Sequence, residues 1–358
     1  MKFRIFKNSK IYIYAPSNTD TGGPTDLHQL ALVLRKKFKK KAYMYYFPSS
    51  NKNPVHKNYK IFRIPFVTNI EDTKRNVLII PEFFQYIENS KKYKNIQKGL
   101  WWLSVDFFLY FRFIYKNHSL IRSLIKVPYN LIFFLNKLTL FRFGNISLFK
   151  YLKFIYLKLL PNNFFKIDGV KVNLVHSDYQ FHALKDKKIS SNYLSDYIRD
   201  EYFIASKKIT IKNKKNIICY NPKKSSVFFQ QFIKINSDLK FVPLINLNLK
   251  EMISVLSTSK IYMDFGFHPG QDHLPREAAI LKNCVITNKE GSAALYNDVP
   301  IRNEFKFDEK NNNFIKMRSK INLIFNNYSK ELEKFRYYRK YLNRQKKTFE
   351  NQIYKIFF

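Results

Sequence analysis

The chain has 358 residues, of which 46% are hydrophobic and 18% aromatic, so it is long enough for two domains and too apolar to be a disordered protein. Its 64 Lys and Arg residues against 26 Asp and Glu give a net charge of +38, which attracts nucleic acid or the anionic inner face of a membrane. Lys, Asn, Ile, Phe and Tyr are abundant together, as in proteins of AT-rich genomes, so codon usage accounts for some of this charge.

The cysteines and the apolar runs bear on the location of the protein. Cys219 and Cys284 both lie within apolar runs, which predicts buried thiols in a reducing compartment, with no disulfide framework and no metal-ligand spacing. Residues 1–16 lack the apolar core and cleavage site of a signal peptide, and no stretch of about 20 apolar residues is free of charge. We therefore expect a cytoplasmic protein, peripheral on the inner face of the cytoplasmic membrane.

The chain opens with a strand, a glycine loop and a helix. Residues 10–15 predict a buried strand, Gly22 and Gly23 lie in the loop, and residues 25–38 carry apolar side chains at helical spacing. This order opens doubly wound α/β domains, whose ligands bind at the carboxyl ends of the strands. The spacing is not the dinucleotide fingerprint GxGxxG, so a tight turn in which glycine permits positive φ is the alternative.

Strands and helices continue to alternate, which predicts a parallel sheet. We expect strands at residues 42–47, 60–64 and 76–80 and from residue 99 through both tryptophans, with a helix at 83–90. Glu82 and Asp106 then lie at the ends of two neighbouring strands, where a carboxylate can accept a proton from a hydroxyl group. Capping of the following helix is the alternative role for each of them.

Residues 107–165 form a basic, aromatic segment that is nearly free of acidic residues. Within it, residues 146–160 place leucine, isoleucine and tyrosine on one helical face and lysines on the rest, as in an interfacial helix. A helical insertion that docks on an anionic membrane is one interpretation, and a buried helical hairpin is the other.

A second α/β domain follows a lysine-rich linker at residues 207–215. We expect a strand at 216–220 that ends before Lys223 and Lys224, and a helix at 227–235, so that the two lysines can neutralise a diphosphate beside a helix N-terminus. The predicted domains are 1–206 and 207–358, and their loops should face one another across a cleft.

The stretch 261–279, IYMDFGFHPGQDHLPREAA, combines a strand, a polar loop with His268 and a helix that opens near Pro275. Exposed N–H groups at such a helix start suit an anionic ligand. A strand at 283–287 then leads to a Gly-Ser loop whose backbone N–H groups could meet a phosphate or a sugar. Long basic helices are expected from residue 318 to 358.

Several of these segments together resemble GT-B glycosyltransferases, and more closely a bacterial group linked to capsule and surface polysaccharides. The resemblance covers most of residues 10–308, apart from 107–165, and the segments that carry it are GGPTDLHQLALVLR, WWLSVD, YLSDYI, YNPKK, DFGFHPG, LPREAA and GSA. It implies two Rossmann-like domains, the N-terminal one on the acceptor side and the C-terminal one binding a nucleotide-sugar.

The resemblance also implies residue roles. Glu277 matches the second glutamate of the E-x7-E signature of the retaining family, which holds the donor ribose hydroxyls, and Arg276 stands beside it. Further donor-site residues by position are Lys223 and Lys224 at the diphosphate, Gly291, Ser292 and Ala293 at the sugar or phosphate, and Gly22 and Gly23 at the phosphate. Asp106 occupies the position where the family often has a histidine that faces the reacting sugar.

One departure concerns the first glutamate of the signature. Pro269 stands eight residues before Glu277, and its neighbour His268 could contact phosphate, as His-Pro loops do in some sialyltransferases that use a CMP-linked sugar. The sugar, the base and the stereochemical outcome therefore stay open.

The expected mechanism needs neither metal nor cofactor. Lys223, Lys224 and helix N-termini stabilise the leaving diphosphate, and Asp106 or Glu82 orients or deprotonates the acceptor hydroxyl if the reaction inverts. The acceptor would be a growing capsule, lipooligosaccharide or other surface glycan, free or lipid-linked. The alternatives are a basic nucleic-acid-binding protein, although no RRM, KH, OB or zinc motif is present, and an inactive scaffold of a polysaccharide-assembly complex. No specific nucleic-acid partner is expected.

Overall fold

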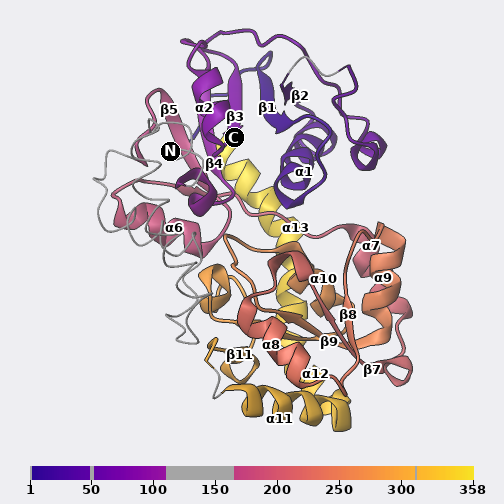
Figure 1. The fold of residues 1–358 in the computed structure, drawn as a ribbon. Helices are drawn as coiled ribbons and strands as arrows, with labels where there is room; N and C mark the ends of the chain where they lie inside the picture. The colour runs from indigo at the N-terminus through magenta and orange to yellow at the C-terminus, as the bar shows by residue number, and fades with distance from the viewer. Residues whose placement is uncertain (1, 49–51, 110–164, 311–312) are drawn as a thin grey trace. The chain divides into compact units, whose positions relative to one another are not determined.

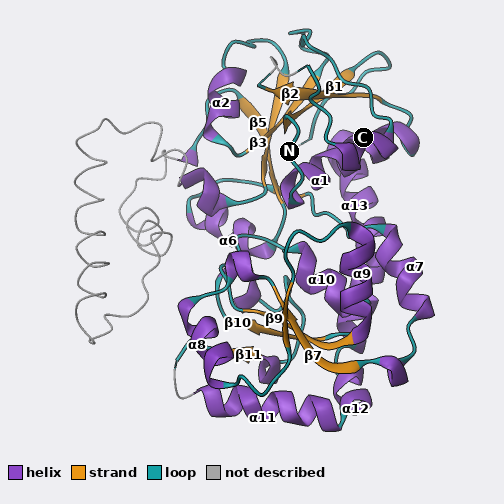
Figure 2. Ribbon diagram, turned by 45° about the vertical axis from the view of Figure 1, so that its right-hand side comes forward, coloured by secondary structure: helices purple, strands orange, loops and turns teal. Residues whose placement is uncertain are grey.

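The computed structural model describes residues 2–48, 52–109, 165–310 and 313–358 (Figure 1). The chain divides into two compact units, and each is an α/β layer structure with helices on both faces of a parallel sheet (Figure 2). The first unit comprises Met1–His176, Gln180–Leu194 and Gln352–Phe358, and the second comprises Ser177–Tyr179 and Ser195–Asn351.

The first unit is built on a six-stranded parallel sheet of order β2-β1-β3-β4-β5-β6. Its strands are β1 Lys10–Pro16, β2 Lys41–Phe47, β3 Val77–Pro81, β4 Gln97–Trp102, β5 Val170–Val175 and β6 Asn192–Tyr193. The helical elements in this part of the chain that the structure gives in full are α1 Gly22–Lys36, η1 Lys57–Phe62, α2 Phe84–Ser90 and α6 Asp178–Asp186. All five residues of β3 are buried, because a central parallel strand is covered by helices on both faces.

The second unit has a five-stranded parallel sheet of order β11-β10-β9-β7-β8. Its strands are β7 Lys215–Tyr220, β8 Phe241–Pro243, β9 Ser259–Asp264, β10 Cys284–Asn288 and β11 Lys306–Phe307. Its helices are α7 Asp200–Lys208, α8 Val227–Ile235, α9 Leu249–Thr258, α10 His273–Ile280, α11 Asn313–Asn326, α12 Tyr328–Glu333 and α13 Arg336–Phe357. Short 3-10 turns lie at η3 Ile211–Asn213, η4 Pro222–Lys224, η5 Gly291–Ala294 and η6 Asn303–Phe305.

Both sheets share one topological feature. The strand order reverses between β1 and β3 in the first unit and between β7 and β9 in the second. At such a switch point the loops after the two strands leave in opposite directions, which opens a crevice at the carboxyl edge where ligands of α/β proteins bind. The loops after β7 and β9 are therefore where a site is expected in the second unit.

The doubly wound parallel architecture confirms the predicted fold class, but some local predictions were wrong. Residues 60–64, expected as a strand, mostly lie in the 3-10 helix η1, because a short apolar-aromatic run does not by itself distinguish a strand from a helical turn. Gly22 and Gly23 form the start of α1, not a loop before it. Asp106 lies in the helical turn at 105–109, four residues beyond the end of β4, so it is not a strand-end residue.

The unit boundary also differs from the predicted one at 206. The division falls after Leu194, and the chain returns to the first unit at Gln352, inside α13. Of the predicted insertion 107–165, residues 110–164 lie outside the described residues. No helix in the described part of the chain is long and apolar enough to span a membrane.

The predicted linker contains a structural residue. Lys214 is 5% exposed, and its Nζ donates hydrogen bonds to the carbonyl oxygens of Leu256, Ser259 and Leu281 at 2.6–2.8 Å. Those carbonyls lie at the end of α9, the start of β9 and the turn after α10. One ammonium therefore joins three chain segments at the amino edge of the sheet.

We predict that Lys214→Met destabilises the protein by about 3 kcal/mol or more, because it leaves buried carbonyl groups without donors. Lys212→Met, at an exposed position two residues away, is the matched control. Thermal unfolding followed by circular dichroism measures both changes. Equal melting temperatures for the two variants would contradict the role of Lys214.

Candidate functional site

The loops after β7 and β9 touch through their backbones. Ser226 N donates to Phe265 O at 2.8 Å, and a Cβ on Gly266 would overlap the carbonyl oxygen of Lys224. Asn288, at the end of β10, donates from its side chain to Gly266 O at 2.8 Å. These contacts make the carboxyl edge of the second sheet a rigid surface. Position 266 requires glycine because the backbone of Lys224 lies too close for a side chain.

A second close approach joins the loops after β9 and β10. Gly291 has φ +58°, and a Cβ there would overlap the carbonyl oxygen of His268. That same oxygen accepts a hydrogen bond from Ser292 N at 2.9 Å, and Ser292 Oγ donates to Gly270 O at 2.5 Å. The Gly-Ser loop therefore braces the His268 segment.

A charge cluster of Lys224, Asp264, His268 and Asp272 lies between these loops, and we call it the β9–α10 cluster. Asp264 and His268 are buried, whereas the side chains of Lys224 and Asp272 are partly exposed. His268 Nδ1 lies 2.9 Å from Asp272 Oδ2, and its Nε2 lies 3.6 Å from Asp264 Oδ1. Lys224 Nζ lies 2.6 Å from Asp272 Oδ2. Asp264 in turn accepts a hydrogen bond from the Tyr262 hydroxyl at 2.8 Å.

In this cluster, Lys224, His268 and Asp272 each favour the charged form. Burial alone lowers the pKa of His268, but Asp264 and the hydrogen bond with Asp272 raise that pKa above its ordinary value. Burial opposes ionisation of Asp272, but Lys224 and His268 hold the pKa of its carboxyl well below the usual range. Burial likewise opposes the charge on Lys224, while Asp272 and Asp264 raise its pKa. The cluster thus sets two cations against two carboxylates.

The same residue types could in principle hold a divalent cation. The ligand atoms of Asp264, His268 and Asp272 all lie within 4.8 Å of one another. However, the Lys224 side chain already lies beside Asp272 Oδ2 and would have to move for a divalent cation to use that oxygen. The geometry therefore fits an internal ion-pair cluster better than a metal centre.

Arg276, predicted to bind a donor, is instead enclosed by protein groups. Its five N–H groups match five hydrogen bonds, two to Asp196 at 2.5 and 2.7 Å and the others to Gln271 O, Asp272 O and Gln345 Oε1. The side chain is 1% exposed, as expected for a buried bidentate pair. Arg276 therefore holds the start of α10 against the 195–198 segment and presents no donor to a ligand.

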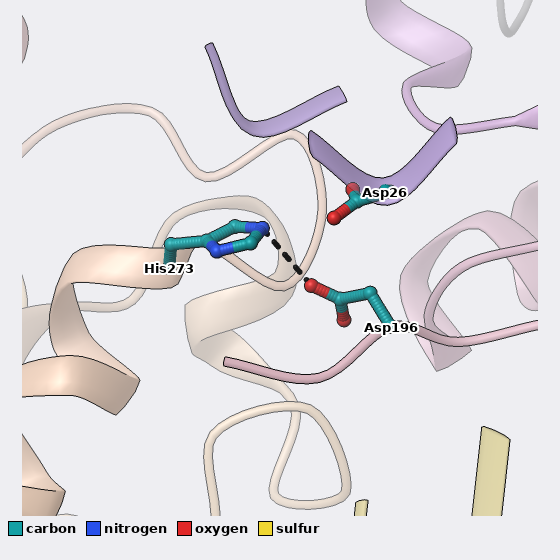
Figure 3. Close-up of side chains that lie close together, drawn as sticks. All are labelled: Asp26, Asp196 and His273. Carbon is teal, nitrogen blue, oxygen red and sulfur yellow. Dashed lines mark ion pairs between the residues drawn. The ribbon is translucent and has the colours of Figure 1, made fainter. Parts of the chain in front are cut away.

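His273 shares the same aspartate. Its Nε2 lies 3.0 Å from Asp196 Oδ2, the pair drawn with a dashed line in Figure 3. Its Nδ1 lies 4.0 Å from Glu277 Oε1, one helical turn further along α10. Burial raises the pKa of Glu277, although His273 and a hydrogen bond from Tyr202 favour its ionised form. The carboxyl oxygens of Glu277 are hydrogen-bond acceptors.

The other predicted residues divide into exposed and enclosed groups. Lys223 is exposed in η4, directly after β7, whereas Lys224 is committed to the β9–α10 cluster. Ser292 and Ala293 are fully buried, and their N–H groups donate to His268 O and Glu290 O. These two N–H groups, expected to meet a phosphate, are therefore already bonded to protein carbonyl groups, one of them in the loop after β9.

In the first unit, Glu82 follows β3 at the switch point and is 1% exposed. Its Oε2 accepts a hydrogen bond from Leu103 N at 3.0 Å, so the loop after β4 is tied to it. Burial raises the pKa of Glu82 to about 8, against opposing hydrogen bonds from the backbone. Gly23 lies close to Leu103 as well, since a Cβ there would be 3.2 Å from its Cδ1.

A pair of buried titratable residues also lies in the first unit. Asp26 in α1 and His176 after β5 have Asp26 Oδ2 3.8 Å from His176 Nε2, and an electrostatic interaction with His176 partly opposes the rise in the pKa of Glu82. Asp106 is also buried, within its helical turn. A buried acid with a pKa near neutrality beside a histidine is typical of acid–base sites.

Solved structures resemble this chain along nearly its whole length. The structure of Alr3699/HepE from Anabaena in complex with UDP-glucose matches with a TM-score of 0.51 at 11% identity, covering 97% of this chain and 98% of that one. An alpha-glucosyltransferase in complex with UDP and a 13-mer DNA containing an HMU base matches with a TM-score of 0.50 at 12% identity, covering 97% and 95%.

The chain has the GT-B fold. No protein-family model matches the chain, and no curated protein does. At such low sequence identity the resemblance concerns architecture alone. The residues that give this GT-B chain its chemistry therefore have to be argued from its own geometry.

Sequence reasoning missed several residues of the site. Asp196 and Asp272 organise the start of α10, and His176 lies beside Glu82, but none was assigned a role. Asp272 and His273 stood in the singled-out stretch, and their spacing of one helical turn from His268 and Glu277 was the available signal. No sequence signal pointed to Asp196, because its partner Arg276 is 80 residues away in the chain.

We predict that Gly291→Ala destabilises the protein by about 1–3 kcal/mol more than Gly169→Ala, because only the first creates a steric overlap. Gly169 also has positive φ, but a Cβ there would meet nothing closer than Lys98 Nζ at 3.7 Å. The pair thus separates backbone strain from the close approach to His268. Chemical denaturation measures both, and equal losses would contradict the brace.

We predict that Glu82→Gln is more stable than the wild type at pH 8.5, and that this difference in stability is much smaller at pH 5. The folded-state pKa of about 8 lies above the ordinary 4.5, so the folded protein retains a proton and wild-type stability falls as pH rises through that window. Glutamine keeps an acceptor for Leu103 N and cannot ionise, so the gain at pH 8.5 should reach up to about 5 kcal/mol.

Glu88→Gln, at a partly exposed position in α2, is the control for that experiment. Unfolding of both variants and of the wild type in denaturant at several pH values gives the comparison. If the free energies of unfolding of Glu82→Gln and the wild type differ by the same amount at every pH, the pKa of the Glu82 carboxyl is not raised.

Proposed function

We propose that this chain is a glycosyltransferase that binds a nucleotide-sugar at the carboxyl edge of β7, β9 and β10. The observation that carries the proposal is the rigid surface at the switch point of the second unit, where two glycines allow three loops to meet backbone to backbone. A surface of this kind, beside the start of α10, suits a phosphate-bearing ligand. The GT-B architecture supports the same class of reaction.

Each part of the proposed donor meets a residue of suitable chemistry. Lys223 is the exposed cation beside the loop after β7 and would neutralise the diphosphate. Glu277 would hold the ribose hydroxyls, since its carboxylate oxygens can accept hydrogen bonds from them. Electrostatic stabilisation by Lys223 and the start of α10 supports a leaving diphosphate without a metal.

His268 receives a positioning role in this proposal. Its ring is completely buried and held by Asp264 and Asp272, so it sets the path of the loop that enters α10. Lys224 acts in the same way through Asp272. The donor would therefore contact the backbone that these side chains arrange.

On the acceptor side, Glu82 would act as the general base. A pKa of about 8 leaves the carboxylate partly ionised at neutral pH and strong enough as a base to take a proton from a sugar hydroxyl. Asp106, buried in a helical turn, is the second candidate. The acceptor would be a capsule, lipooligosaccharide or other surface glycan, free or lipid-linked, and a net charge of +38 would hold the enzyme on the anionic inner membrane surface.

Donor binding tests the proposal directly. We expect one of UDP-, GDP-, CMP- or CDP-sugars to raise the melting temperature of the wild type. Lys223→Ala should weaken that binding about tenfold or more through loss of a charge-assisted hydrogen bond, and Glu277→Gln should weaken it by a similar factor. Lys250→Ala, at an exposed site in α9, should bind like the wild type.

Two results would overturn the assignment. The first is that no nucleotide-sugar binds, and the second is that both site variants bind like Lys250→Ala. Donor binding without hydrolysis or transfer would favour an inactive scaffold. Binding of nucleic acid with no response to any nucleotide-sugar would favour a basic nucleic-acid-binding protein.

A further inference from the structure

The second unit contains a cavity of about 910 Å³ that is lined by none of the residues assigned to the proposed donor site. It is lined by the segment that follows η5 and by residues of α12 and α13, and none of its lining residues belongs to β7, β9 or β10. The lining residues are Tyr296, Pro300, Arg302, Lys330, Glu333, Lys334, Arg336, Tyr337 and Lys340. Its volume falls within the range of about 300–1,000 Å³ that is usual for small-ligand sites.

The cavity carries an excess of positive charge. Five of its lining residues are cationic and only Glu333 is acidic. Arg336 lies 3.3 Å from Glu333, and Lys334 is paired with Glu331 at 2.7 Å. Lys330 and Lys340 form no ion pair or side-chain hydrogen bond within the described part of the chain, so they can meet an anion without breaking an internal contact.

Two exposed tyrosines stand at the same cavity. Tyr296 is 54% exposed and Tyr337 is 58% exposed, and their rings are stacked with centroids 6.2 Å apart and planes at 20°. Neighbouring exposed aromatic rings form the kind of surface patch that marks a ligand-binding site, and tyrosine offers an apolar face together with a hydroxyl. The C–H face of a pyranose ring fits such a surface, and its hydroxyl groups fit the phenol.

We propose that this cavity binds a glycan that carries carboxylate or phosphate groups. The sugar rings would lie on Tyr296 and Tyr337, and the anionic groups would pair with Lys330 and Lys340. That this glycan is the growing acceptor polymer, retained between additions, rests on the proposed function. The proposal that the cavity binds an anionic glycan does not depend on the proposed function.

The geometry favours a glycan over a nucleic-acid strand. The two tyrosine rings already lie against each other, so no base inserts between them. Sites for single-stranded nucleic acid follow the backbone over about 4–16 nucleotides with successive aromatic side chains, whereas this cavity offers one tyrosine pair.

Binding of defined oligosaccharides to the full chain tests the proposal. The probes are a hexamer of galacturonic acid, an oligosaccharide that bears mannose 6-phosphate, neutral maltohexaose and a dT hexanucleotide, each titrated by calorimetry at fixed ionic strength. The first two probes separate carboxylate from phosphate as the preferred anion. We expect at least one of them to bind the wild type tenfold or more tightly than maltohexaose.

Two variants locate the site. Lys330→Glu with Lys340→Glu should weaken binding of the anionic glycan tenfold or more, and Tyr337→Ala should weaken it about fivefold. The double variant Lys212→Glu with Lys250→Glu makes the same change in net charge at exposed positions elsewhere and should bind like the wild type. Tyr354→Ala, which removes a tyrosine that is 61% exposed, is the aromatic control.

Any of three outcomes would overturn the proposal: no anionic glycan binds, both charge variants lose binding equally, or the dT hexanucleotide binds more tightly and loses affinity in the cavity variants. The third outcome would assign the cavity to nucleic acid. The nucleotide-sugar melting shift, measured on the same variants, reports the donor site separately. A cavity variant that keeps this shift but loses the glycan separates failure of one proposal from failure of the other.

Discussion

The proposed donor surface depends on buried positive groups that are each matched by carboxylates. His268 is held by Asp264 and Asp272, and Arg276 is held by Asp196, with every guanidinium N–H satisfied. An unpaired charge at such depth would be strongly destabilising, so the two pairings leave the start of α10 a single arrangement. The loop from β9 to α10 is thus fixed by electrostatics.

Glycines complete that constraint through close packing. Gly266 lets the loop after β9 touch Lys224, and Gly291 lets the loop after β10 touch the His268 carbonyl. With both contacts made, three strand ends form one surface, and ligand contacts are left to Lys223, Glu277 and the backbone. The paired charges and the glycines therefore shape the site, and the exposed Lys223 and the buried Glu277 are left to bind the ligand.

The excess of cationic residues is not found in the ion-pair clusters that shape the proposed donor site. The buried ion-pair clusters are near charge balance, whereas the cavity at α12 and α13 has five cations around two exposed tyrosines. A net charge of +38 therefore does not describe the proposed donor site, although it bears on what the outer surface attracts. The proposals of a nucleotide-sugar donor and of an anionic glycan refer to these two separate regions.

Local pattern in the sequence determined most elements of this protein, since apolar runs and helical periodicity predicted β1, β7, α8 and the parallel α/β class. The local pattern gave a wrong prediction at residues 60–64, because a short aromatic run has no periodicity that distinguishes a strand from a helical turn. It also misplaced Asp106, because no residue pattern marks the end of β4. Only the tertiary structure decided that Arg276 and Ser292 are enclosed, that Glu82 has a raised pKa, and that Tyr296 lies beside Tyr337. Each of these depends on partners far apart in the chain, and burial and pairing are properties of those contacts and not of the residue type.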